Sequence, residues 1–311
     1  MLFTFASFFF GLILLLLGSH QMVQEAIGIA KKYQVPPLLI GTLLVGFGTS
    51  VPELLVSTNA LLHGSVGLCV GNALGSYIGN IGLVLGFSAL VRPISIPSSV
   101  LTHDLPLLSI ALMSAVFLVI DGDLSVIDSC FLVILLFGYV LVSFTNSQLG
   151  EASQSPKVSD GSIWWLLTKF VFFMLMLLLG SEIIVQTATE IAKDFGLSEL
   201  VVGLSVVAVG TSLPELATAL MSLYAREDEL CVGNIIGSNI FCLLGILPLP
   251  ALVTFDSIAT ENLWREFSVM IVMTLLFWIF AAKFDKNKQI NRFEGGALLL
   301  SFCVYIVSLF H

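Results

Sequence analysis

A seven-residue stretch occurs twice in this chain: Gly48-Thr49-Ser50-Val51-Pro52-Glu53-Leu54 returns as Gly210-Thr211-Ser212-Leu213-Pro214-Glu215-Leu216. A second stretch, LCVGN followed by GS, begins at Leu68 and again at Leu230. Both pairs are separated by 162 residues, and residues 18–81 align with residues 180–243 without a gap, with 26 of the 64 positions identical. The chain therefore consists of two related halves.

Composition sets the class of protein. Hydrophobic residues make up 57% of the chain and charged residues 11%, and the mean hydropathy is +1.04. These values are typical of an integral membrane protein and exclude an ordinary soluble domain. We therefore predict an all-α membrane protein with ten transmembrane helices. The predicted spans cover residues 2–30, 37–63, 67–91, 103–120, 124–145, 162–192, 199–224, 230–254, 264–282 and 293–310.

The basic residues predict an orientation. With ten spans, only Lys193 and Arg265 fall on one face of the membrane, and all other Lys and Arg residues fall on the opposite face. The positive-inside bias makes the richer face cytoplasmic. Both termini are then external or periplasmic, and we expect a multi-pass protein of the cell inner (plasma) membrane.

The repeat predicts how the halves are oriented. Residues 1–150 form the first five-helix repeat, with its central motif at 41–81, and residues 151–311 form the second, with its motif at 203–243. Because five is an odd number, the second repeat enters the membrane upside down relative to the first. Inverted-topology repeats are typical of secondary transporters, whose binding site lies at the midplane between the halves.

The first motif places polar oxygens where hydrocarbon is expected. Pro52 cannot donate a backbone hydrogen bond, so a carbonyl near Gly48 loses its helical partner. That carbonyl, the hydroxyls of Thr49 and Ser50, and the Glu53 carboxylate would form a cluster of hard oxygens. Such oxygens suit Ca²⁺, Na⁺ or Mg²⁺.

The second copy supplies the matching half of this cluster through Ala208, Thr211, Ser212 and Glu215. Two carboxylates facing each other in a medium of low dielectric constant repel one another. One Ca²⁺ neutralises both, as do two Na⁺ or two protons. If Glu53 and Glu215 lie close together, mutually exclusive occupancy of this kind provides the basis of antiport.

The second motif carries small residues and amides. Gly71 and Gly75, like Gly233 and Gly237, show the four-residue spacing that is usual where helices pack closely. Ser76 and Asn80 lie one helical turn apart and can face one cavity, whereas Ser238 and Cys242 occupy those positions in the second copy.

The paired Gly-Thr-Ser-x-Pro-Glu-Leu and Gly-Asn-x-x-Gly-Ser segments resemble the two alpha repeats of the calcium/cation antiporter superfamily, and of its prokaryotic sodium/calcium exchangers in particular. The resemblance implies ten helices and exchange of cytoplasmic Ca²⁺ for external Na⁺ by alternating access, in which the first and sixth helices slide across the other eight.

The resemblance also implies roles for individual residues. Glu53 and Glu215 match the central Ca²⁺ ligands, assisted by the backbone oxygens of Thr49 and Thr211. Further positions match two flanking Na⁺ sites and a midplane amide: Gly46, Ser50 and Ser76 for one Na⁺ site, Ala208, Ser212 and Ser238 for the other, and Asn80 for the amide. Cys242 departs from the Asp or Asn of the family, and a thiol is a weak ligand for hard ions.

Several alternatives stay open. A Ca²⁺/H⁺ antiporter on the same fold would use the same two glutamates, and Cys242 could favour softer divalent ions such as Cd²⁺ or Zn²⁺. A cation channel fits inverted halves less well, and no nucleophile–base pair or His-rich metal motif suggests an enzyme. We expect no cofactor, no nucleic acid and no obligate protein partner, only the transported ions Ca²⁺ and Na⁺ (or H⁺) and the lipid bilayer.

Overall fold

A computed structural model of the chain describes residues 2–147, 162–194, 208–255, 258–259, 263–282 and 289–309. Within these ranges, eight helical segments are long and apolar enough to cross a membrane. The prediction of an all-α membrane protein is confirmed. The eight segments are Thr4–Tyr33, Pro37–Leu62, Val66–Val91, Val100–Leu118, Val126–Thr145, Ile163–Ile191, Asp228–Thr254 and Trp264–Ala281.

The two other predicted spans are not among these eight segments. The span predicted at 293–310 corresponds to helix α16, Arg292–Ser308, which has 17 residues. The span predicted at 199–224 corresponds to α11, Ala208–Thr211, and α12, Leu213–Tyr224, and its first part, 199–207, lies outside the described residues. The total of ten membrane-crossing helices therefore stays a prediction.

Several spans are interrupted by short π-helical segments, labelled η, and four two-residue strands lie between spans. The elements of the first half are α1 (Leu2–Tyr33), α2 (Pro37–Leu39), η1 (Ile40–Gly46), α3 (Phe47–Thr49), α4 (Val51–Leu62), α5 (Val66–Gly79), η2 (Asn80–Leu85), α6 (Gly86–Val91), β1 (Ile94–Ser95), η3 (Val100–Asp104), α7 (Leu105–Leu118), β2 (Asp123–Leu124) and α8 (Val126–Ser147). The further elements of the second half are α9 (Ile163–Asp194), α13 (Asp228–Phe241), η5 (Cys242–Ile246), α14 (Leu249–Thr254), β3 (Ile258–Ala259), α15 (Trp264–Ala281) and β4 (Gln289–Ile290).

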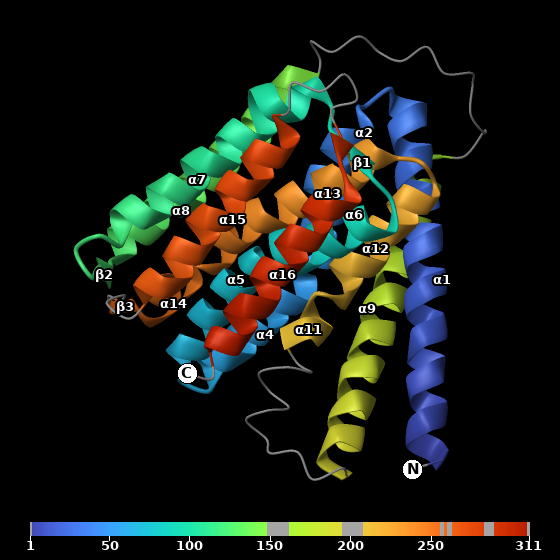
Figure 1. Cartoon of the computed structure of the whole chain (residues 1–311), viewed down its shortest axis with the longest axis horizontal. Helices are drawn as coiled ribbons and strands as arrows, with labels where there is room; N and C mark the ends of the chain where they lie inside the picture. The colour runs from blue at the N-terminus through green and yellow to red at the C-terminus, as the bar shows by residue number, and fades with distance from the viewer. Residues whose placement is uncertain are drawn as a thin grey trace.

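The long helices α1 and α9 lie side by side at one edge of the molecule (Figure 1). Glycines permit this close approach. A β-carbon at Gly18 would lie 2.6 Å from the backbone nitrogen of Leu177, and one at Gly180 would lie 2.5 Å from the backbone nitrogen of Leu15. Both separations are shorter than real contacts, so the two helices can pack this tightly only without side chains at these positions.

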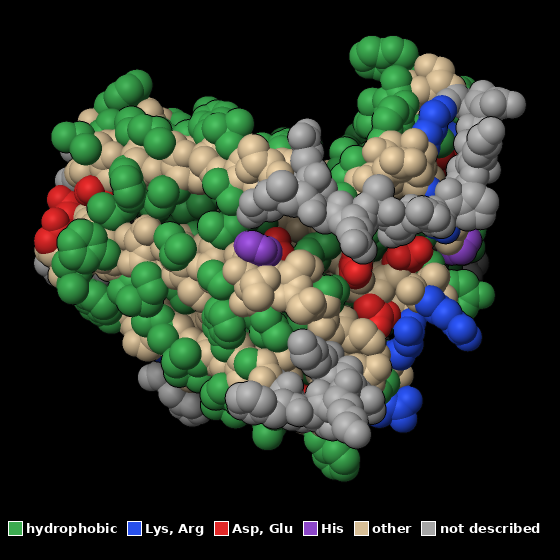
Figure 2. Space-filling view, turned by 90° about the horizontal axis from the view of Figure 1, so that it is seen from above, with side chains coloured by type: hydrophobic (Ala, Val, Ile, Leu, Met, Phe, Trp, Pro, Cys, Tyr) green, Lys and Arg blue, Asp and Glu red, His purple; other side chains and the backbone are tan. Residues whose placement is uncertain are grey.

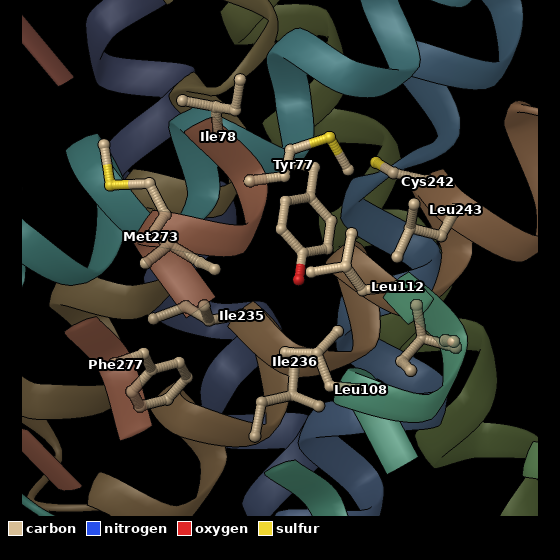
Figure 3. Packing of buried hydrophobic residues seen from close by; sticks show 14 of the residues in the cluster. Tyr77, Ile78, Leu108, Leu112, Ile235, Ile236, Cys242, Leu243, Met273 and Phe277 are labelled. Atoms are coloured by element: carbon tan, nitrogen blue, oxygen red, sulfur yellow. The ribbon is translucent and has the colours of Figure 1, made fainter. Parts of the chain in front are cut away.

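The remaining helices form a bundle with α13 at its centre. Eleven of its 14 residues are buried, from Leu230 to Ile240. Figure 3 shows the apolar packing around it, where Ile235 and Ile236 lie near Leu108 and Tyr77. By contrast, α8 exposes large apolar side chains such as Ile127 and Phe137. Exposed apolar surface of this kind is what hydrocarbon chains of a bilayer would cover.

Short antiparallel strand pairs join the halves at opposite ends of the bundle (Figure 1). Ile94 of β1 pairs with Ile290 of β4, and Asp123 of β2 pairs with Ala259 of β3. The first turn of α1 and the last turn of α16 lie at the same end of the molecule (Figure 1).

The end that carries β1 and β4 is also rich in charge. Seen from that end, Lys and Arg side chains gather toward one side, near several Asp and Glu side chains (Figure 2). Arg92 forms an ion pair with Asp228, with 3.2 Å between Nη2 and Oδ1, and Arg92 also donates to the carbonyl of Leu223. Arg292 donates to the carbonyl of Val91. Arg92 and Arg292 therefore lie at the same end of the bundle, as the ten-span prediction requires.

Candidate ion-binding site

Each repeated motif forms a broken helix. Ser50 separates α3 from α4 with φ −83° and ψ 8°, and Ser212 separates α11 from α12 with φ −86° and ψ 1°. A proline follows each serine by two residues, within the first turn of the next helix, where the missing N–H costs nothing. The helix break expected from the proline is therefore present in both copies.

The break places both glutamates in the first turn of a helix. There the helix dipole and the free N–H groups favour a negative charge. Each glutamate is only 1% exposed, and the hydroxyl of Ser50, three residues before Glu53, lies 3.4 Å from Oε1 of Glu215. The two buried glutamates are therefore carried by neighbouring turns.

One oxygen of each carboxylate has no partner. Oε2 of Glu53 and Oε2 of Glu215 are buried and make no hydrogen bond to any described residue. Buried polar atoms are almost always satisfied by protein, water or an ion. Two such atoms on buried carboxylates of neighbouring turns are what a site for positively charged cargo would present.

The carbonyl of Gly46 is surrounded by donors. It accepts from the Ser50 backbone at 3.2 Å, from the Ser50 hydroxyl at 2.9 Å and from the Ser238 hydroxyl at 3.0 Å, and Thr49 Oγ1 lies 3.3 Å away. A carbonyl oxygen has two lone pairs, so these donors compete for it. If those hydroxyls turned away, a cation could take their place on the carbonyl and on the hydroxyl oxygens.

The two halves are joined at this point. The Ser50 hydroxyl, which has a single proton, also lies within reach of Glu215 Oε1 at 3.4 Å, and the Ser238 hydroxyl lies 3.5 Å from Thr49 Oγ1. The crossing of η1 with α13 makes this possible, because a β-carbon at Gly237 would lie only 2.0 Å from the Thr42 carbonyl oxygen.

The glycine-packing prediction is confirmed for the second copy. Gly233 and Gly237 both lie against η1 or α2 backbone, with separations of 2.4 Å and 2.0 Å from a built β-carbon. For Gly71 and Gly75, a built β-carbon would meet no described atom within 4 Å. The repeat counterparts of the residues that contact Gly233 and Gly237 lie at 200–204, outside the described residues, so the packing of Gly71 and Gly75 stays a prediction.

The other predicted residues lie in the same elements. Ser76 and Asn80 are buried at the end of α5 and the start of η2. Ser212 is buried, and its hydroxyl would be 3.4 Å from a β-carbon at Gly79. The remaining two positions are placed only by the backbone: Ala208 begins α11 and Thr211 ends it.

Cys242 begins η5 as a buried free thiol. Its segment η5 packs against α4, the helix that carries Glu53, and the ring of the preceding residue, Phe241, lies 5.0 Å from that of Phe47 in the first motif. The departure from the family pattern is therefore located beside the first motif. Among the described residues, no three His, Cys, Asp or Glu side chains are grouped closely enough to hold a metal ion, so any bound cation would need hydroxyl and carbonyl oxygens as well.

Sequence reasoning missed two asparagines in this site. Asn72 donates to the backbone carbonyl of Glu53 at 3.0 Å, and Asn234 contacts the carbonyl of Glu215 at 3.4 Å. The available signal was their place in the repeat, since each asparagine follows its glutamate by 19 residues.

Comparisons with known proteins agree with this geometry. The family model for the sodium/calcium exchanger protein matches residues 3–145 and 165–311. Inner membrane protein YrbG of Escherichia coli is 35% identical, covering 100% of this chain and 98% of its own. Sodium/calcium exchanger MaX1 of Methanosarcina acetivorans is 28% identical, covering 97% of each chain.

A solved structure of the sodium-calcium exchanger NCX_Mj, soaked with 2.5 mM Na⁺ and 0.1 mM Ca²⁺, superposes with a TM-score of 0.85 at 34% identity and covers 99% of both chains. The match extends over the whole fold and both halves of the site. This chain belongs to the sodium/calcium exchanger family, within the calcium/cation antiporters.

Proposed function

We propose that this protein exchanges Ca²⁺ for Na⁺ across the membrane by alternating access, with Glu53 and Glu215 binding the ions at one shared site. The observation that carries this proposal is the pair of buried carboxylates on neighbouring turns, each with one oxygen that makes no hydrogen bond to a described residue. Groups of this kind are costly at membrane depth and are usually functional.

Charge balance explains the exchange. Two negative charges in a medium of low dielectric constant need two positive charges. One Ca²⁺ supplies them, and so do several Na⁺, but both sets cannot occupy the site at the same time. Ca²⁺ and Na⁺ also prefer the carboxylate, carbonyl and hydroxyl oxygens found here.

The remaining roles follow the family resemblance. The backbone oxygens of Thr49 and Thr211 would complete the Ca²⁺ site. Two flanking sets of residues would hold Na⁺: Gly46, Ser50 and Ser76 in the first set, and Ala208, Ser212 and Ser238 in the second. The amide of Asn80 would line the midplane. The Ser50 hydroxyl of the first set and the Ser238 hydroxyl of the second both contact the Gly46 carbonyl, at 2.9 Å and 3.0 Å. These contacts support a cation site that Gly46 and Ser50 share with Ser238.

The proposed architecture is ten helices in two inverted repeats, residues 1–150 and 151–311. The two separate stretches matched by the family model support this division. In this arrangement α1 and α9 slide together past the bundle, and their tight glycine contacts support movement as a pair. We place the protein in the inner membrane with both termini external.

The test is ⁴⁵Ca²⁺ uptake into proteoliposomes loaded with Na⁺ and diluted into Na⁺-free buffer. Uptake should require the outward Na⁺ gradient and fall to background in Glu53→Gln and in Glu215→Gln. Glu182→Gln is the matched control, because Glu182 is exposed on α9, and it should transport normally.

Two outcomes would change the proposal. Uptake driven equally well by a pH gradient without Na⁺ would identify a Ca²⁺/H⁺ antiporter on the same fold. Uptake that survives both glutamine substitutions would remove the two-carboxylate site altogether.

A further inference from the structure

We propose that Asn72 and Asn234 are positioning residues, which hold the turns that carry the two glutamates and so set the affinity of the site for Ca²⁺. The inference rests on the proposed function. Neither residue is a candidate ion ligand, since each acts through another group.

Asn72 fixes the first glutamate from a neighbouring helix. Its Nδ2 lies on α5 and donates to the Glu53 carbonyl at 3.0 Å and to the Ser57 hydroxyl at 3.0 Å, both on α4. Ser57 is fully buried. These two bonds attach the start of α4 to α5 at the residue that carries the carboxylate.

Asn234 does the same for the second glutamate and also joins the two halves. Its Nδ2 on α13 contacts the Glu215 carbonyl at 3.4 Å, and its Oδ1 accepts from Thr49 Oγ1 at 3.1 Å. The side chain is completely buried. One amide therefore contacts the second glutamate's backbone and the first motif's threonine at once.

This arrangement suits a site beside a helix break. A broken helix has lost part of the hydrogen bonding that normally holds a turn in place, so the glutamate depends on contacts with neighbouring helices for its position. Ion ligands held to within about 0.5 Å need such support from surrounding groups.

The bond from Thr49 has a second consequence. Its hydroxyl has one proton, and both the Gly46 carbonyl and Asn234 Oδ1 lie within reach of it. When Thr49 donates to Asn234, one of the donors that compete for the Gly46 carbonyl is removed, and the proposed function assigns this carbonyl to a Na⁺ site. Asn234 is thus connected to both ions, whereas the bonds described for Asn72 lead to the Glu53 turn.

The test uses leucine substitutions, which keep the approximate shape but remove the amide. For Asn72→Leu and Asn234→Leu we expect the Ca²⁺ concentration at half-maximal exchange to rise about five- to thirtyfold, the effect of losing one or two hydrogen bonds. The maximal rate should stay within about twofold, because both glutamates remain. Asn234→Leu should also change the Na⁺ concentration that half-inhibits Ca²⁺ uptake.

A second measurement separates positioning from general stability. Ca²⁺ bound to the native state raises the melting temperature of purified protein by an amount that grows with the logarithm of its affinity. A purely structural role would lower the melting temperature without Ca²⁺ and leave the Ca²⁺-induced rise unchanged. We expect the rise itself to shrink.

Controls keep the result interpretable. Asn59→Leu, at an exposed position of α4, should behave as the wild type, and Asn72→Ala and Asn234→Ala serve if leucine prevents folding. Wild-type affinity in both leucine or both alanine variants, or an equal shift in Asn59→Leu, would overturn the positioning role. Absence of Ca²⁺ binding by the wild type would instead count against the proposed function.

Discussion

The contact between α13 and η1 provides a direct test of how packing supports the site. An alanine at Gly237 would place its β-carbon 2.0 Å from the Thr42 carbonyl oxygen, whereas contacts below 3.0 Å essentially do not occur. The two helices would have to separate by at least 1 Å at this point. The obstacle is backbone, so no side-chain rotation can relieve it.

The size of the effect follows from what this separation breaks. The Ser238 hydroxyl lies 3.0 Å from the Gly46 carbonyl, and Thr49 lies 3.1 Å from Asn234 Oδ1, so both bonds would exceed hydrogen-bonding distance. Each is worth about 1 kcal/mol, and overpacking itself costs about 1–3 kcal/mol. We expect Gly237→Ala to lose about 3–5 kcal/mol of stability and most Ca²⁺ exchange.

The assay is thermal unfolding of purified protein in detergent, together with ⁴⁵Ca²⁺ exchange in proteoliposomes. Gly138→Ala is the control, since Gly138 lies within α8 and a β-carbon there meets no described atom within 4 Å. Its stability should stay within about 1 kcal/mol of the wild type, the range of the Gly-to-Ala helix propensity. Equal stability of the two variants would refute the packing argument.

Three further changes have defined outcomes. Tyr77→Phe removes a 2.7 Å hydrogen bond to Thr274 and should lower the free energy of unfolding by about 1 kcal/mol. The rate of Ca²⁺ exchange should change less than the stability does. Cys242→Asp adds a third carboxylate beside the glutamate pair, so Ca²⁺ uptake should become dependent on pH or on a further monovalent cation; unchanged ion dependence would make this position silent. Burial raises the pKa of Glu227 above its ordinary value, so the native state binds more protons than the unfolded state just above pH 4.5, and stability there falls as pH rises. Glu227→Gln should flatten this slope in unfolding measured from pH 4.5 to 7.

Much of the site was accessible from sequence because its chemistry is unusual for its surroundings. A carboxylate without a basic neighbour inside an apolar span predicts a buried functional group, and Glu53 and Glu215 are indeed 1% exposed. The proline two residues after a serine predicts a broken helix, and Ser50 and Ser212 have non-helical backbone angles. Both inferences depend only on local covalent chemistry and on the membrane.

The contacts between halves could not be predicted in this way. Asn234 resembles many amides that simply pack in a membrane helix, and only the crossing of α13 with η1 brings it to Thr49. The contact of Gly237 with the Thr42 carbonyl likewise depends on which helix becomes central. One-dimensional patterns carry no information about that choice.

The repeat therefore gives two similar motifs in unequal environments. Tyr77 pairs with Thr274, but its counterpart Asn239 is fully buried, and neither polar atom of its side chain bonds to a described residue. Likewise, the buried amide Asn80 corresponds to the thiol of Cys242. The hard oxygens that both copies share, above all Glu53 and Glu215, are compatible with a site used from either side of the membrane. The residues in which the copies differ are where a preference for one side, or for one ion, would arise.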